Sequence, residues 1–129
     1  MIRLNSSLLN LVNQMSFSEI EIKNISRSIN AFMKKRRPPV EDRDQVDLLY
    51  KIVNNSIEIF EIRPQWDNPN ATNEIPIAKT TFVKSKDCWK IFWMRSDLKW
   101  HAYFPDSEVE TLDQFLAIVE EDEDCCFWG

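Results

Sequence analysis

The chain has almost no glycine: its 129 residues include one, Gly129. The phosphate-binding loops G-x-x-x-x-G-K-S/T and G-x-G-x-x-G need glycines, because only a bare backbone can approach the phosphate closely. The sequence therefore excludes nucleotide-dependent enzymes of those two classes. Turns that require a positive φ must instead use Asn or Asp, the other residues that tolerate this conformation best.

Long apolar runs are also absent, since none approaches the roughly 20 residues that cross a bilayer. We therefore expect no integral membrane protein. The three cysteines, Cys88, Cys125 and Cys126, are odd in number, and no basic segment followed by a long apolar run opens the chain as a signal peptide does. Reduced thiols in a cytoplasm are the simplest interpretation.

Potential metal ligands are scarce. His101 is the single histidine, and Cys125 and Cys126 are adjacent in the sequence. Adjacent side chains on an extended chain point to opposite faces, unlike the C-x2-C pair of a zinc site. We expect neither a metal nor a cofactor.

Basic residues are missing from the C-terminal region. All nine Asp and Glu residues after Phe104 stand without a Lys or Arg, and the formal net charge of the chain is −5. Binding to a nucleic-acid backbone draws on a cationic field, so this acidity argues against it as the main function. The basic cluster Lys34–Arg37 leaves a local patch open, although cations at a helix C-terminus also complement the helix dipole.

The composition that remains is that of one globular domain. Hydrophobic residues make up 43% of the chain and charged residues 29%, as in ordinary soluble proteins. A chain of this length is long enough to bury a core without a metal or disulfide. We predict a single domain over residues 1–129, in which residues 1–16 are an N-terminal extension with an amphipathic helix at about Ser6–Gln14.

Two further helices are better marked by their starts. Ser18 and Glu21 form a capping box, and the helix they begin should end near Lys35, because Pro38-Pro39 cannot continue it. Thr111 and Gln114 form a second capping box before the apolar stripe of a final helix. The members of that stripe are Leu112, Phe115, Leu116 and Val119.

Between these helices the apolar period shortens to that of strands. Asn54-Asn55 separates the first two strands and Ser85–Asp87 separates the third from the fourth, whereas Arg63–Asn70 is predicted as a loop. The predicted strands run at about Gln45–Ile52, Ile57–Ile62, Ile77–Lys84 and along both arms of Cys88–Phe104. This order predicts an α+β fold: a five-stranded antiparallel meander with two N-terminal helices and one C-terminal helix packed on one face.

The segment Cys88–Phe104 holds six of the fifteen aromatic residues in the chain. Its alternation about Arg95–Leu98 predicts a hairpin with two different faces. We assign the face of Trp89, Ile91 and Trp93 to the core. The opposite face should then carry large apolar groups mixed with polar ones and stay partly open. Its predicted members are Lys90, Phe92, Lys99, His101 and Tyr103.

Several motifs together resemble an uncharacterised bacterial family that is classed as a domain of unknown function. They are IRPQWDNP, Ala78-Lys79, WKIFWMRSDLKWHAYFP, Pro38-Pro39, Arg43-Asp44-Gln45 and the closing Phe127-Trp128-Gly129. The likeness spans about residues 17 to 129. It implies a small cytoplasmic bacterial domain and no particular activity. Phe127 and Trp128 are expected to fold back on their own sheet, with a plug for a partner as the alternative.

We therefore expect a non-enzymatic binding module that uses the exposed aromatic and basic face of the sheet. Trp66, with Arg63 and Asp67 beside it, either covers the edge of the core, which we prefer, or anchors a partner, since Trp and Arg dominate interface hot spots. The candidate binding residues are Arg63, Trp66, Lys79, Lys90, Phe92, Arg95, Lys99, His101 and Tyr103. The partner is either another protein or a second copy that pairs through a sheet edge.

Two alternatives remain open. Single-stranded nucleic acid stacks on aromatic platforms beside cations, although the acidic C-terminal third would repel it. A small hydrolase or transferase built around His101 needs a nucleophile within reach, and Cys88 on the neighbouring strand is the candidate.

Overall fold

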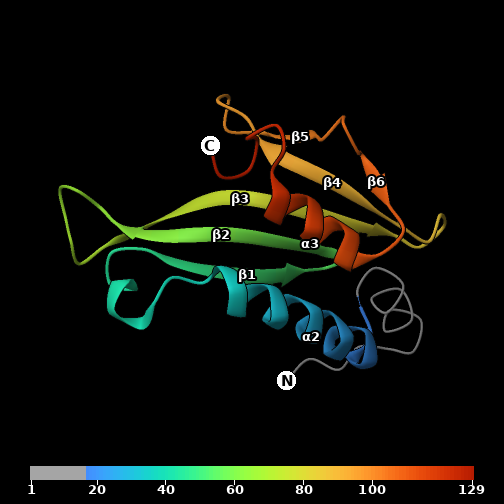
Figure 1. The fold of residues 1–129 in the computed structure, drawn as a ribbon, viewed down its shortest axis with the longest axis horizontal. Coiled ribbons are helices and arrows are strands. Elements are labelled where there is room, and N and C mark those ends of the chain that lie inside the picture. The colour runs from blue at the N-terminus through green and yellow to red at the C-terminus, as the bar shows by residue number, and fades with distance from the viewer. Residues whose placement is uncertain (1–16) are drawn as a thin grey trace, which may run out of the picture.

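The computed structural model describes residues 17–129, so the predicted helix at Ser6–Gln14 lies outside the described residues. These residues contain two α-helices, α2 and α3, a 3-10 turn, η1, and the strands β1 to β6 (Figure 1). The helical elements are α2 (Glu19–Arg36), η1 (Val40–Asp42) and α3 (Leu112–Glu121). The strands are β1 (Asp47–Val53), β2 (Ser56–Pro64), β3 (Thr72–Val83), β4 (Cys88–Met94), β5 (Trp100–Ala102) and β6 (Glu108–Val109).

The sheet is antiparallel and follows chain order, β1-β2-β3-β4-β5, which confirms the predicted α+β class and five-stranded meander. A sixth strand, β6, was not predicted. It pairs with β4 through Trp89 and Val109, on the same edge of β4 that β5 occupies nearer the other end. A strand of two residues is too short to show a periodic pattern in the sequence, so only its pairing with β4 defines it.

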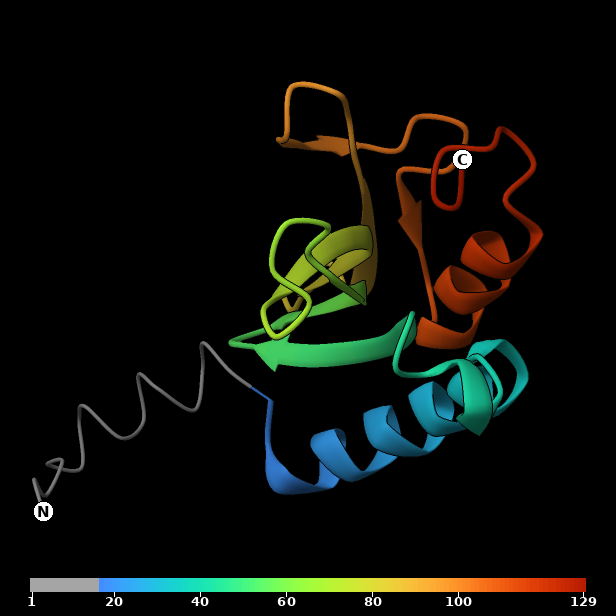
Figure 2. The same ribbon diagram turned by 90° about the vertical axis from the view of Figure 1, so that its left-hand side faces the viewer.

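The helix arrangement differs from the predicted one. In place of three helices on one face, residues 17–129 supply α2 beside β1 and α3 beside β4 and β6, and the two helices contact each other (Figure 2). Both capping boxes are present, because Ser18 and Thr111 accept hydrogen bonds from the backbone of Glu21 and Gln114. Helix α2 ends one residue beyond the predicted position.

The β2–β3 hairpin is longer than predicted, because part of the expected loop is paired. Arg63 lies opposite Asn73, and Pro64 lies opposite Thr72. The residues from Thr72 to Pro76 are all exposed. Strands that project beyond the core have no buried face, so this arm lacks the alternation by which a strand is recognised in a sequence.

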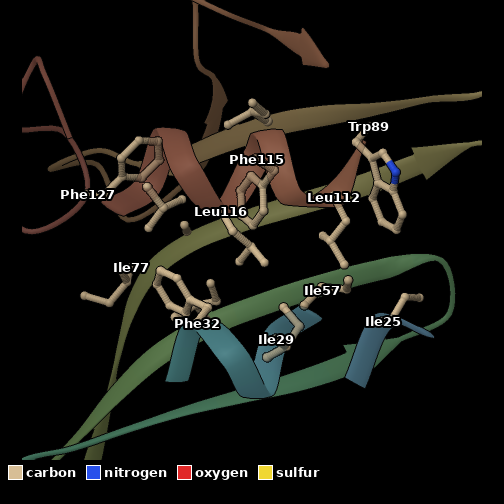
Figure 3. Close-up of a cluster of buried hydrophobic side chains, with 14 of the residues drawn as sticks. Ile25, Ile29, Phe32, Ile57, Ile77, Trp89, Leu112, Phe115, Leu116 and Phe127 are labelled. Carbon is tan, nitrogen blue, oxygen red and sulfur yellow. The ribbon is translucent and has the colours of Figure 1, made fainter. Parts of the chain in front are cut away.

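One hydrophobic core joins both helices to the sheet (Figure 3). Its fully buried members include Ile29 from α2, Ile57 and Ile91 from the sheet and Phe115 from α3. All four apolar residues predicted for the α3 stripe are buried. Thr80 is buried among these apolar groups, and its hydroxyl donates to the Lys90 carbonyl at 2.8 Å.

The predicted division of the aromatic hairpin into faces is partly wrong. Trp89 and Ile91 are buried as expected. However, His101 pairs with Trp93, so both side chains lie on the helix-covered side, and Tyr103 is only 3% exposed. Paired residues in an antiparallel ladder share a face, so a one-residue difference in register moves a whole strand to the other side.

Candidate functional site

Residues at the end of the aromatic hairpin surround a concave site of about 380 Å³, which we call the β5 cleft. Strand β4 and its following loop supply one wall, the chain after β5 supplies the second, and the C-terminal segment supplies the third. The lining residues are Trp93, Arg95, His101, Ala102, Tyr103, Phe104, Pro105, Asp124 and Cys126. The volume falls in the range of roughly 300–1,000 Å³ that is typical of small-molecule sites.

The β4–β5 loop holds its polar groups in place around Asp97. One carboxylate oxygen of Asp97 lies 2.7 Å from His101 Nε2, and the other accepts from the Lys99 amide at 3.0 Å. The hydrogen bond from His101 is the largest of the causes that lower the pKa of Asp97 below its ordinary value. Leu98 takes a φ of +62°, where we had expected Asn or Asp.

The guanidinium of Arg95 lies over the ring of Trp93, with Cζ 5.5 Å from the ring centroid. Among the described residues it forms no ion pair. Its fork of N–H donors is therefore held at the cleft by stacking and remains open to an acceptor.

The C-terminal wall of the cleft contributes an acid, Asp124. The Tyr103 hydroxyl donates to Asp124 Oδ2 at 3.3 Å. Burial, followed by the nearby Asp124 charge, raises the pKa of Tyr103 to about 12, so this hydroxyl keeps its proton. The same two causes, in the same order, raise the pKa of the Cys126 thiol. This thiol is therefore a poor nucleophile near neutral pH.

The C-terminal wall is fixed by the closing aromatic residues. Phe127 is 5% exposed, and its ring centroid lies 5.0 Å from that of Tyr103. The Trp128 indole N–H donates to the Val119 carbonyl at 2.8 Å, and the Arg36 guanidinium lies 4.2 Å from the Trp128 ring centroid. Phe127 and Trp128 thus fold back on their own domain, as we had preferred from the sequence.

A second candidate surface lies on the opposite side of the sheet, which we call the outer face. Lys79 pairs with Phe92, and its Nζ lies 5.8 Å from the Phe92 ring centroid and 5.9 Å from that of Trp100. Lys51 Nζ lies 5.1 Å from the Phe60 ring centroid on the same face. The outer face comprises Lys51, Glu58, Phe60, Glu74, Lys79, Lys90, Phe92, Trp100 and Glu108.

The nine candidate binding residues do not form one surface. Three of them, Arg95, His101 and Tyr103, line the β5 cleft, and three others, Lys79, Lys90 and Phe92, lie on the outer face. Lys99 is exposed in the β4–β5 loop. Arg63 pairs with Glu61 at 2.9 Å near the far end of the β2–β3 hairpin, and Trp66 is 93% exposed in the loop beyond it (Figure 1).

Part of the basic cluster serves the fold. Arg37 donates from Nε and Nη2 to both carboxylate oxygens of Asp47, at 2.8 and 2.9 Å. Arg36 stacks on Trp128. Lys34 and Lys35 are the exposed remainder, so half of the patch that favoured nucleic acid is engaged within the domain.

The structure does not bring Cys88 to His101. Cys88 pairs with Val83, whereas His101 pairs with Trp93, five residues further along β4. At 3.3 Å per residue this separates the two by about 16 Å, which is too far for a thiol and its base. Among residues 17–129, no group of three or more His, Cys, Asp or Glu side chains is placed to hold a metal ion.

Two other concave regions carry less varied chemistry. One of about 650 Å³ beside β6 is lined by Lys86, Asp87, Glu108 and Glu110, and Lys86 pairs with Glu108 at 3.7 Å. Another of about 270 Å³ lies between the starts of α2 and α3 and includes no cation. The β5 cleft holds charges of both signs, from Arg95 and Asp124, beside the rings of Trp93, Tyr103 and Phe104.

Three residues were not predicted as candidates: Trp100 on the outer face, Asp124 in the cleft, and Asp97, which contacts the cleft residue His101. Trp100 belongs to neither of the two predicted faces of the aromatic hairpin and is not among the nine candidate binding residues. Asp97 stands four residues before His101 and was treated as part of the turn. Asp124 carries no local pattern, because only the folding back of the C-terminal segment brings it to Tyr103.

Comparison with protein families matches residues 17–129 to the family described as Domain of unknown function (DUF3024). The match covers most of the chain, so the protein belongs to this family, as the motifs suggested. No curated protein and no solved structure matches the chain. Within the described residues, no helix is both long and apolar enough to cross a membrane.

Proposed function

We propose that this domain is a binding module without catalytic activity, which recognises a protein partner through the outer face of the sheet. The observation that carries the proposal is the position of the Lys79 ammonium, within 6 Å of the rings of both Phe92 and Trp100. The three side chains are half-buried, and both helices contribute to the core on the other side. A cytoplasmic location, which the three free thiols favour, belongs to the same proposal.

The aromatic side chains suit a protein interface. Tyr, Trp and Phe are enriched in interface cores, because they bury a large apolar area at little entropic cost. Phe92 and Trp100 already have their rings restrained by neighbouring strands and by Lys79. A restrained ring loses less freedom when it binds.

The charges of the outer face favour protein over nucleic acid. Lys51, Lys79 and Lys90 are balanced by Glu58, Glu74 and Glu108, and Lys51 is paired with Glu58 and Glu74 at 3.5 and 3.3 Å. A face with balanced charge does not create the cationic field that a phosphate backbone requires. Lys79 and its two rings instead suit a protein segment that carries a carboxylate beside an apolar side chain.

Two other occupants are outcomes of the same test. Single-stranded nucleic acid is favoured by one specific observation, the pair of aromatic rings about a lysine on an open sheet face. A second copy of the chain is favoured by the free edge of β1 in the described sheet. Cys88 is too far from His101 to be its nucleophile. An enzyme built around His101 therefore stays an untested alternative without an assigned nucleophile.

The test uses the full chain and three labelled probes: a peptide that alternates Glu with Phe and Leu, the same peptide with Lys in place of Glu, and oligothymidylate. Fluorescence anisotropy is expected to show binding of the acidic peptide alone. Trp100→Ala and Lys79→Gln are each expected to weaken that binding about tenfold, as central interface residues do. Trp66→Ala in the exposed loop beyond β2 and Lys34→Gln on the exposed surface of α2 are the controls, and neither should change it.

Three results would overturn the proposal. The first is equal affinity for the acidic and basic peptides. The second is preferred binding of oligothymidylate with an affinity that falls steeply with salt, which would establish the nucleic-acid alternative. The third is a concentration-dependent dimer, measured by sedimentation, that Trp100→Ala abolishes.

A further inference from the structure

We propose that the β5 cleft is a binding site for a small molecule in which an oxyanion, either a carboxylate or a phosphate, is attached to one flat apolar ring. This site is separate from the proposed protein-binding surface, because the outer face lies on the opposite side of the sheet. Arg95 and Asp124 carry opposite charges and line the same cleft, together with the rings of Trp93, Tyr103 and Phe104.

Arg95 is the anchor for the oxyanion. Its guanidinium is stacked on Trp93 at 5.5 Å and forms no ion pair within the described residues. In contrast, Arg37 and Arg63 already pair with carboxylates. A planar fork of N–H donors matches the two oxygens of a carboxylate or phosphate. The β5 cleft therefore presents a positioned arginine whose donors are not used by the fold.

The Arg95 charge is the smallest of the causes that lower the pKa of Asp97, and the two side chains form no ion pair. Asp97 accepts from His101 and from the Lys99 amide, so both of its oxygens are engaged. These two bonds also tie the loop to β5, which fixes the backbone that carries Arg95. His101 itself lines the cleft beside Arg95, and its ring provides a polar edge there.

The apolar wall explains why a ring belongs in the ligand. Phe104 is 83% exposed although it lines a concave site, and Trp93 and Tyr103 lie on other sides of the same site. A flat ring in the cleft would cover Phe104 and remove apolar surface from water. Aromatic pairs gain further from offset or edge-to-face contact.

Asp124 limits which groups the ligand can carry besides its oxyanion. Asp124 accepts from the Tyr103 hydroxyl, and the Cys126 thiol lies nearby in its neutral form. This carboxylate repels a second oxyanion and accepts hydrogen bonds. The preferred ligand therefore has a single anionic group, and a hydroxyl or amino substituent elsewhere on its ring increases its affinity.

The experiment titrates the full chain with benzoate, 4-hydroxybenzoate, phenyl phosphate, benzamide and inorganic phosphate. Nitrogen–proton correlation spectra report on the side-chain N–H groups of Trp93 and Arg95. The two benzoates or phenyl phosphate should shift these signals and saturate. Benzamide, which keeps the ring without the charge, should bind at least about tenfold more weakly, because it loses a charge-assisted contact. Comparison of benzoate with phenyl phosphate identifies which oxyanion is preferred.

Matched variants separate the anchor from general charge effects. Arg95→Gln should weaken binding at least about tenfold, whereas Lys99→Gln, which removes the same charge from the same exposed loop, should leave it within about twofold. Phe104→Ala should weaken binding of the ring compounds, and Lys79→Gln on the outer face should not. All four side chains are exposed or half-buried, so the variants are expected to keep the wild-type circular dichroism spectrum.

Failure of this proposal is distinct from failure of the proposed protein-binding function. The inference is overturned if the aromatic oxyanions do not saturate the signals, if benzamide binds equally well, or if Arg95→Gln and Lys99→Gln behave alike. Saturable binding by inorganic phosphate with the same affinity as phenyl phosphate would also overturn it, since the ring would then contribute nothing.

Discussion

Helix α2 ends in three cations, Lys34, Lys35 and Arg36, whereas α3 has Glu120 and Glu121 in its last turn and no basic residue there. A helix C-terminus carries partial negative charge, so the cations stabilise the end of α2 and the acids oppose the end of α3. Both helices nevertheless stop at a defined residue. The two ends therefore rely on different sources of stability.

The end of α2 is local. Pro38 and Pro39 follow within three residues, and the Arg37 amide donates to the Met33 carbonyl. Nothing distant in the sequence is needed to stop this helix, because Pro38 keeps Arg37, the residue before it, out of the helical region.

The end of α3 depends on residues further along the chain. Asp122 caps the helix with a φ of +44°, and its two carboxylate oxygens accept from the amides of Phe127 and Trp128 at 3.0 and 2.9 Å. The Trp128 indole then donates to Val119, one of the carbonyls left free at the helix end. A helix with unfavourable charges is thus completed by tertiary contacts, and the same contacts build one wall of the β5 cleft.

Phe127→Ala should have the largest effect on the stability of the α3 end, because it removes the buried ring that anchors the C-terminal segment. A buried Phe truncated to Ala costs about 3 kcal/mol or more of the free energy of unfolding. Urea denaturation measures the change. Phe104→Ala is the matched control, since that ring is 83% exposed and its loss should cost less than about 0.5 kcal/mol. Equal losses for the two variants would contradict the assigned role of Phe127.

Substitutions of Asp122 separate its backbone conformation from its hydrogen bonds. Asp122→Gly suits the positive φ but loses both charge-assisted bonds, so we expect a loss of about 2 kcal/mol in the free energy of unfolding. Asp122→Asn keeps an acceptor and tolerates the same φ, and about half of that loss is expected. If the glycine variant were as stable as the wild type, the two hydrogen bonds would contribute nothing and the cap would be purely conformational.

Arg36→Ala should have a smaller effect, because it removes the stacking contact that links the end of α2 to Trp128. Such a contact contributes about 0.5–1 kcal/mol. Lys34→Ala, two residues earlier and exposed, is the control for the loss of a cation near the helix dipole. Arg36→Ala, unlike Lys34→Ala, should also expose Trp128 to solvent, and a shift in tryptophan fluorescence would report that change.

The pair Arg37–Asp47 should give the smallest effect and the clearest pH dependence. The hydrogen bonds from Arg37 are the largest cause that lowers the pKa of Asp47 below its ordinary value of 3.8. A depressed carboxylate pKa stabilises the fold above 3.8 and loses that contribution as the pH falls through the folded value. Because Arg37 is partly exposed, solvent screening keeps this contribution small.

The measurement is the difference in unfolding free energy between wild type and Arg37→Ala at several pH values. We expect a constant difference from neutral pH down to about pH 5, followed by a decline at lower pH. A difference that grew on acidification would show that Asp47 is not the titrating partner.

Much of the fold was predictable because its determinants are local. Both capping boxes use residues three apart, and Asn54 occupies a turn position with φ of +55° that the lack of glycine assigned to Asn or Asp. The buried stripe of α3 followed directly from its helical spacing. The candidate site was less predictable, because membership of a sheet face depends on the register of a distant pair.

The β4–β5 hairpin shows the limit most clearly. Its two strands and its loop were recognised from alternation, but the pairing of Trp93 with His101 moved Tyr103 into the core. The alternation within each strand does not reveal a one-residue change in register. Such a change nevertheless moves every side chain of the strand to the other face of the sheet. The extension of β2 and β3 was not predicted for another reason. Strands without a buried face show no alternation of apolar and polar residues.

The sequence alone predicted where α2 and α3 begin, the apolar stripe that α3 buries, the turn at Asn54 and the exclusion of two classes of phosphate-binding loop. These properties depend on residues within a few positions of one another. Only the tertiary structure decided the faces of the aromatic hairpin, the position of β6, the end of α3 and the union of Arg95, Tyr103 and Asp124 in one cleft. Those features join residues that are distant along the chain, and packing alone brings them together.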